Sequence, residues 1–281
     1  MKNYFHICTF FLFTSVTYSQ GNLFYYQEAK YYHIFGDKVN IRAAADKNSD
    51  VLMQVTIGDS IQVKSVTDVM LELNGMVYPW VEVEWIYNKQ KKSGYIWGGL
   101  FSFYHENFQT ESGRTYQLYL GPLRYDNDSE ELLGEARLCA DGQILDARSF
   151  QLHVFDRKAP CFTMGVYPQN YYTVRSEYRH IEHISSVSLT VESCGPTGDV
   201  YILMNDGKII FSGSELGTFS GGDFREGNEF IFPWDKGGMK EKIFEYYSYF
   251  SEAYEDEPEK DTTYLIQTYS KQNGKFILDD K

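Results

Sequence analysis

Basic residues are scarce in this sequence of 281 residues. It has 26 Lys and Arg against 39 Asp and Glu, which gives a formal net charge of −13 at pH 7. A protein that binds DNA or RNA needs a basic surface to neutralise phosphates, so no nucleic-acid partner is expected. The same excess of acidic residues predicts a soluble chain that anionic membrane surfaces repel.

Sequence motifs for metals, phosphates and cofactors are lacking. The chain has no Cys-x-x-Cys and no His-Glu-x-x-His, and the pair His180-x-x-His183 is too little for a zinc site. Asp126–Glu130 indicates an acidic turn, because Glu131 stands where a calcium loop needs glycine. Ser212–Asp223 is rich in Gly and Ser but lacks the Lys-Ser/Thr ending of a phosphate-binding loop. We therefore expect no metal and no cofactor.

Long apolar runs are absent after the first twenty residues. Tyr4–Val16 is an apolar stretch of signal-peptide length that is too short to span a bilayer. The small residues Thr17 and Ser19 precede a cleavage position before Gln20. Residues 1–19 are therefore predicted to be a secretory signal peptide, with an ordinary buried strand or helix as the alternative. This predicts an exported protein, periplasmic or secreted, with no stable membrane insertion.

Only 4 cysteines occur, and three of them follow the predicted signal peptide: Cys139, Cys161 and Cys194. An oxidising compartment permits one disulfide, with three possible pairings and one thiol left over. The alternative, that all three are small buried apolar residues, stays open. Neither Cys139 nor Cys194 stands at the start of a predicted helix beside a base, so no catalytic residue is expected.

Aromatic residues are abundant, with 24 Tyr and 20 Phe, whereas there are only 7 Pro. This composition favours β-sheet, and no helical period persists for three turns. Two-residue hairpin turns are predicted at Asp141-Gly142, Asp206-Gly207 and Asn273-Gly274. The strands expected around them are 187–191, 201–204, 208–211, 243–250 and 263–269. The sequence therefore predicts an all-β fold.

Residues 38–102 contain short apolar segments separated by turn residues, which predicts a small antiparallel barrel. The segments include Val39–Arg42, Trp80–Val83 and Gly94–Trp97, and Asn74-Gly75 predicts a hairpin within them. In this order they resemble the bacterial SH3-like domain, SH3b, whose opening Val-Asn-Val-Arg, Trp-x-x-Val strand and closing Gly-Trp-Val segment they approximate.

The sequence departs from the SH3b pattern at two places. Ala43–Ala45 stands where the family usually carries Gly-Pro or Ser-Gly, and the insertion between Val63 and Trp80 is longer than usual. Both departures concern the ligand-binding loops more than the strands. The resemblance covers about 65 residues.

Outside residues 38–102, composition distinguishes three further segments of the chain. Residues 20–37 form an aromatic lead-in that is expected to add an edge strand or to pack on the barrel, and 103–114 reads as a polar linker. Residues 115–281 are dominated by strand signals. They predict a larger antiparallel β sandwich or open barrel after the SH3-like barrel.

The SH3b resemblance implies an exported, non-enzymatic binding protein whose partner is a cell-wall peptide or another envelope protein. A shallow groove lined by aromatic rings would supply the contact area. The candidate rings are Tyr78, Trp80, Tyr95 and Trp97. The alternative is that most of these rings fill the small core, and only one of Tyr95 and Trp97 is expected to do so.

Two other functional classes are kept as alternatives. One is a cell-envelope hydrolase with its active site in 115–281, which would need a nucleophile within about 3 Å of a base. The other is a carbohydrate-binding β sandwich, which would need exposed coplanar aromatic rings on one face.

Overall fold

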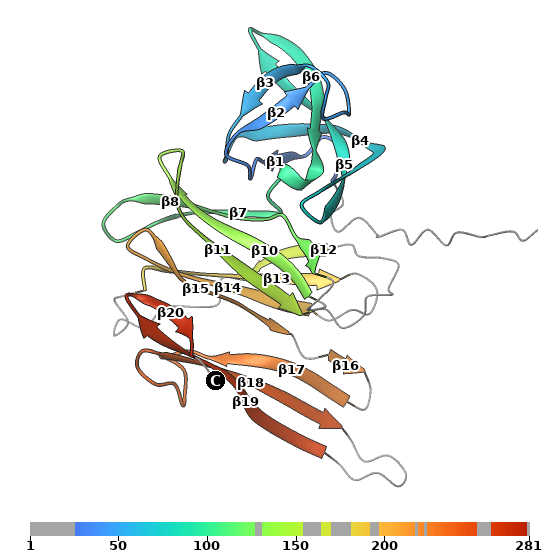
Figure 1. The fold of residues 1–281 in the computed structure, drawn as a ribbon. Coiled ribbons are helices and arrows are strands. Elements are labelled where there is room, and N and C mark those ends of the chain that lie inside the picture. The colour runs from blue at the N-terminus through green and yellow to red at the C-terminus, as the bar shows by residue number, and fades with distance from the viewer. Residues whose placement is uncertain are drawn as a thin grey trace, which may run out of the picture.

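The described part of the chain is built almost entirely from antiparallel strands (Figure 1). One short 3₁₀ helix, η1 (Gly98–Leu100), is the only helix within it. The predicted all-β fold class is confirmed. Within the same ranges, no helix has the length and apolar character needed to cross a membrane. The computed structural model describes residues 26–126, 131–153, 164–169, 181–191, 197–216, 219–221, 224–251 and 260–279.

Several sequence predictions fall outside these ranges. They are the signal peptide at 1–19, the cysteines Cys161 and Cys194, the histidine His180, and most of the acidic turn, residues 127–130.

The first sheet forms the barrel-like N-terminal part, with strand order β1-β4-β5-β6-β2-β3. Val39 and Ile41 enter its core while Asn40 and Arg42 stay half-buried, as the alternation in the sequence predicts. The lead-in contributes the edge strand β1 and the ring of Tyr26, which is buried. The strands are β1 (Tyr31–His33), β2 (Val39–Arg42), β3 (Val51–Val55), β4 (Ser60–Leu73), β5 (Met76–Tyr87) and β6 (Gln90–Trp97).

The remaining strands form three further sheets. The second sheet has the order β11-β10-β8-β7, with β9 paired to β10. Its strands are β7 (Tyr104–Gln109), β8 (Thr115–Leu120), β9 (Arg124–Asp126), β10 (Glu131–Ala140) and β11 (Gln143–His153). The third sheet consists of β12 (Met164–Gln169), β13 (His183–Val191), β14 (Thr197–Asn205) and β15 (Lys208–Leu216). The fourth consists of β16 (Phe219–Gly221), β17 (Phe224–Ile231), β18 (Lys242–Ser251), β19 (Lys260–Gln272) and β20 (Lys275–Leu278).

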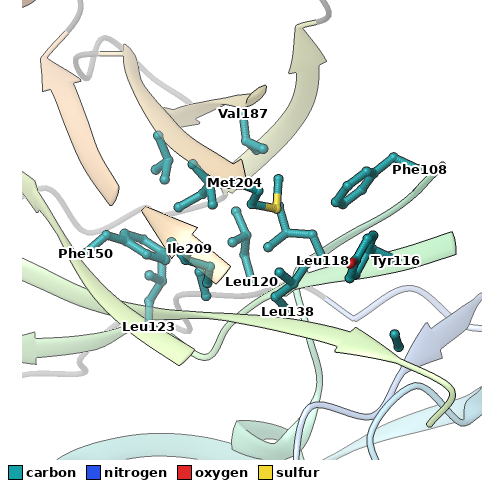
Figure 2. Packing of buried hydrophobic residues seen from close by; sticks show 14 of the residues in the cluster. Phe108, Tyr116, Leu118, Leu120, Leu123, Leu138, Phe150, Val187, Met204 and Ile209 are labelled. Carbon is teal, nitrogen blue, oxygen red and sulfur yellow. The ribbon is translucent and has the colours of Figure 1, made fainter. Parts of the chain in front are cut away.

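The third sheet is buried on both faces. One face packs on the second sheet through a core that includes Leu118, Leu138, Met204 and Ile209 (Figure 2). The other face packs on the fourth sheet through a second core. It includes Ile181, Tyr201, Leu203, Ile210, Phe211, Phe230, Phe232, Trp234, Ile243 and Phe276. Burial on both faces explains why 201–204 reads as a continuous apolar run instead of an alternating one. The C-terminal part is thus a stack of three sheets.

The predicted hairpin turns form as expected. Asn74-Gly75, Asp141-Gly142, Asp206-Gly207 and Asn273-Gly274 each have positive φ at both residues, the geometry of a two-residue type I′ turn. A fifth turn of this kind, Asn88-Lys89, joins β5 to β6 with φ of 50° and 64°. It lacks the glycine that would have marked it in the sequence.

The segment predicted as a linker, 103–114, contains β7, which pairs with β8 over its whole length. The barrel therefore joins the second sheet directly. Phe35 and Ile57 from the barrel pack with Tyr119 and Cys139 from that sheet. The hydroxyl of Tyr78 also donates a hydrogen bond of 2.7 Å to the Leu123 carbonyl.

Candidate functional site

The structure places the four candidate aromatic rings at very different depths. Tyr78, Trp80 and Trp97 have only 1 %, 4 % and 4 % of their surface exposed, whereas Tyr95 is half-buried. The indole N–H of Trp97 donates to the Leu71 carbonyl at 2.9 Å, and its ring packs edge-on against Tyr78. These three rings fill the barrel core in this structure. Tyr95 is the one candidate of the four whose ring is partly exposed.

Tyr95 lies in a row of outward side chains that crosses four strands. It is directly opposite Arg42 of β2 on one side and Glu82 of β5 on the other. Glu82 in turn faces Ser65 of β4. Directly opposed residues in an antiparallel sheet share one face and pack together. The sheet therefore presents a guanidinium, a phenol, a carboxylate and a hydroxyl in sequence.

Lys64 completes this set of polar groups. Its Nζ lies 2.7 Å from Glu82 Oε1, and the Ser65 hydroxyl donates to Glu82 Oε2 at 3.0 Å. The hydrogen bond from Lys64 lowers the pKa of Glu82, and the same bond raises the pKa of Lys64. Both groups are therefore charged at neutral pH. We call Arg42, Lys64, Glu82 and Tyr95 the barrel face.

The barrel face is suited to binding more than to chemistry. It offers both hydrogen-bond donors and acceptors around one ring, and Arg42 is fixed in place by a 2.7 Å hydrogen bond from Nη1 to the Ser49 carbonyl. Sequence reasoning found Tyr95, but it did not single out Arg42, Lys64 or Glu82. The pairing of Lys64 with Glu82 across β4 and β5 depends on the register, which shifts between Val63 and Ser65.

A second polar cluster lies between β7 and β13, at the contact of the second and third sheets. His183 Nε2 is 2.9 Å from Glu106 Oε1, and the Tyr104 hydroxyl donates to Glu106 Oε2 at 3.0 Å. The Phe108 ring stacks on His183, with centroids 3.9 Å apart and planes 5° apart. The Ser185 hydroxyl is buried in the same place, without a hydrogen bond of normal geometry.

This second cluster contains a hydroxyl, an imidazole and a carboxylate, which are the group types that hydrolases use. Its geometry differs from that arrangement, because the carboxylate lies at the centre and accepts from His183 and Tyr104. Ser185 is only 2 % exposed. The cluster joins the second and third sheets at the edge of their shared core, through the contact of Glu106 with His183.

The cluster predicts an acid-dependent loss of stability. Burial by itself raises the pKa of Glu106, but the hydrogen bond and charge of His183, with the nearby hydroxyls of Ser185 and Tyr104, outweigh it and lower the pKa. A lowered folded-state pKa stabilises the fold above the unfolded-state value of about 4.3, and this contribution is lost as pH falls through the folded-state value.

Glu106→Gln is therefore expected to lower the free energy of unfolding near neutral pH and to lower it less in acid. Urea unfolding of both proteins from about pH 7 down to about pH 3 measures the difference. A difference that stays constant over this range would contradict the assignment.

Cys139 is a free, buried thiol beside Tyr119. Burial raises its pKa to about 11, so it stays protonated at neutral pH and is a poor nucleophile. Among the described residues there is also no group of three His, Cys, Asp or Glu side chains that could hold a metal ion.

The fourth sheet carries exposed and half-buried aromatic rings of the kind that a carbohydrate-binding sandwich would use. Tyr247 and Tyr264 have ring centroids 5.2 Å apart, but their planes are inclined by 42°. Phe244 and Tyr246 lie 6.4 Å apart with an angle of 50°. Neither pair provides a flat platform.

No protein-family model, curated protein or solved structure matches this chain significantly.

Proposed function

We propose that this chain is an exported, non-enzymatic binding protein, whose barrel acts as an SH3b-like module. The barrel face would recognise a peptide, a protein or a component of the cell wall. The observation that carries this proposal is the row Arg42, Tyr95 and Glu82, three different contact chemistries held side by side on paired strands.

The physical basis is preorganisation. Each backbone position of the row lies within a hydrogen-bonded sheet, and the barrel core beneath it is filled by Trp80 and Trp97. Tyr95 has few rotatable bonds, so ordering its ring on binding costs little entropy. Arg42 and Glu82 supply directional hydrogen bonds to the amides and hydroxyls that cell-wall peptides and glycans carry.

Tyr95→Ala tests this proposal. Using purified peptidoglycan sacculi as the probe, we expect the variant to bind more weakly by about 1–3 kcal/mol, the size of a hot-spot residue. Co-sedimentation with sacculi measures the affinity, and the thermal unfolding midpoint shows that the fold is kept. Tyr264→Ala is the matched control, because this tyrosine is 53 % exposed and lies in the fourth sheet.

Equal binding by wild type and Tyr95→Ala would refute the role of the barrel face. If the protein does not bind sacculi at all, the same pair of variants tests binding to proteins captured from the cell envelope. In that case Glu82→Gln should weaken capture together with Tyr95→Ala, since the two side chains are neighbours.

Export has its own test. The apolar stretch before Gln20 is the basis for the predicted cleavage. Mass spectrometry of the protein from its native cells is expected to find a chain that begins at or near Gln20 in the periplasm or the medium. An intact chain with Met1 in the cytoplasm would contradict both export and the envelope partner.

A cell-envelope hydrolase is the rival proposal, with the Glu106 cluster as its best described candidate. Ser185→Ala separates the two, because it removes the serine hydroxyl of this cluster and keeps the Glu106–His183 contact. Loss of a measurable hydrolytic activity in this variant would favour the enzyme.

A further inference from the structure

The hairpin tip between β5 and β6 exposes apolar side chains beside lysines. Ile86 is 75 % exposed, more than any other large apolar side chain in the described part of the chain, and Tyr87 is 57 % exposed. Lys89, Lys91 and Lys92 follow within five positions and are exposed. We call these five residues the hairpin tip. Two adjacent large apolar side chains this exposed indicate a contact surface.

The charge of the tip is opposite to that of the molecule. Residues 26–102 carry eight basic and nine acidic residues, whereas 103–281 carry seventeen basic and thirty acidic residues. The excess of acidic residues therefore belongs to residues 103–281, and the barrel is close to neutral. Within the barrel, Lys91 pairs with Glu84 at 2.9 Å, but Lys89 and Lys92 make no ion pair with any described residue. The charges of Lys89 and Lys92 are therefore available to a binding partner.

The tip also points away from the acidic part of the protein (Figure 1). The other end of β5 contacts the second sheet, where the Tyr78 hydroxyl binds the Leu123 carbonyl. Tyr87 lies nine residues further along the same strand, which corresponds to roughly 30 Å at 3.3 Å per residue. This separation exceeds the Debye length of about 8 Å at physiological salt, so the acidic sheets are screened from whatever the tip contacts.

We propose that the hairpin tip docks this protein on an anionic phospholipid surface. Ile86 and Tyr87 enter the boundary between headgroups and acyl chains, and the lysines contact the phosphates. The type I′ turn at Asn88-Lys89 holds the side chains of the tip on a rigid β-hairpin, so little conformational entropy is lost on docking.

A lipid surface fits the tip better than a folded protein does. A protein partner would need a concave site to enclose a convex tip, whereas a bilayer accepts a protruding apolar side chain without a preformed pocket. Trp85 is half-buried, and it is followed two residues later by Tyr87 on the same face of β5. Trp and Tyr are enriched at the level of lipid headgroups, because their rings are apolar at one end and polar at the other.

Flotation with lipid vesicles tests the proposal on the full mature chain. We expect binding to vesicles that contain roughly one-third phosphatidylglycerol in phosphatidylcholine, little binding to pure phosphatidylcholine, and weaker binding at high salt. Lys89→Gln with Lys92→Gln should weaken binding by about 25-fold, at about fivefold per lysine. Ile86→Ser with Tyr87→Ser should weaken it by at least about tenfold.

Two matched controls separate the tip from the rest of the surface. Lys236→Gln with Lys240→Gln removes two exposed lysines outside the barrel, and Val69→Ser with Met70→Ser removes two exposed apolar side chains from the β4–β5 hairpin. Both should bind vesicles like wild type. All variants change exposed residues, so their thermal unfolding midpoints should match.

The proposal is overturned if the protein fails to float with anionic vesicles, or if the tip variants float as wild type does. An equal loss in the control variants overturns it as well. So does a result in which the tip variants lose capture of a second protein but keep vesicle binding, because the tip would then be a protein-docking surface. None of these outcomes depends on binding at the barrel face, since Tyr95→Ala should leave vesicle binding unchanged.

Discussion

Trp97→Ala is expected to lower the free energy of unfolding by about 3–5 kcal/mol, the cost of removing a large ring from a packed core. The indole is 4 % exposed and donates to two carbonyls, those of Leu71 and Tyr78. Gly99 packs directly against the indole, since a Cβ atom at this position would come within 2.4 Å of the Trp97 ring. The variant therefore leaves a cavity and removes both of these hydrogen bonds. Urea unfolding followed by far-UV circular dichroism measures the loss.

Tyr95→Ala, two residues away on the same strand, is the control for this effect. The Tyr95 ring is half-buried and packs only at the edge of the core, so its loss should cost about 1 kcal/mol. A similar destabilisation by both variants would mean that the two rings share one environment. The division between a core tryptophan and a surface tyrosine would then be incorrect.

Arg148→Met is expected to destabilise the stack of three sheets by about 2–4 kcal/mol, because it removes two charge-assisted hydrogen bonds to carbonyls of buried residues. Arg148 of β11 donates from Nη1 to the Ile210 carbonyl at 3.0 Å and from Nη2 to the Phe276 carbonyl at 2.7 Å. These carbonyls belong to β15 and β20, so one side chain joins the second, third and fourth sheets. Burial lowers the pKa of its guanidinium, which nevertheless stays charged at neutral pH.

Two further variants make this prediction specific. Arg148→Lys keeps the charge but has a single nitrogen in place of the forked guanidinium, so it should recover only part of the loss. Lys208→Met removes an exposed cation from β15 and should change the free energy of unfolding by less than about 0.5 kcal/mol. If Arg148→Met is as harmless as Lys208→Met, the two hydrogen bonds contribute nothing net to stability.

The contact between the second and third sheets also explains the inward position of Glu106. Glu106 lies in the segment that the sequence predicts to be a linker, and its charge there gives no hint of an inward position. It faces inward because His183, which is 77 residues further along the chain, supplies the partner. A carboxylate that is largely withdrawn from water needs such a partner, and sequence spacing alone does not reveal it.

Local features were predictable because their causes are local. An Asx-Gly pair adopts the positive φ angles of a type I′ turn whatever surrounds it, and all four such pairs named from the sequence do so. The β5–β6 turn was missed because Asn88-Lys89 adopts the same angles without glycine. Its strands compensate by pairing along their full length from Trp80 to Tyr87.

The sequence by itself determined the all-β class, the turn positions and the inward and outward alternation of Val39–Arg42, because these depend on backbone geometry and on a period of two residues. Only the tertiary structure decided which aromatic rings are buried, since a ring suits a core and a binding groove equally well until its neighbours are known. It also decided where the charge lies. Net charge is a sum over the chain, and the sum hides a basic, apolar hairpin tip on an acidic protein.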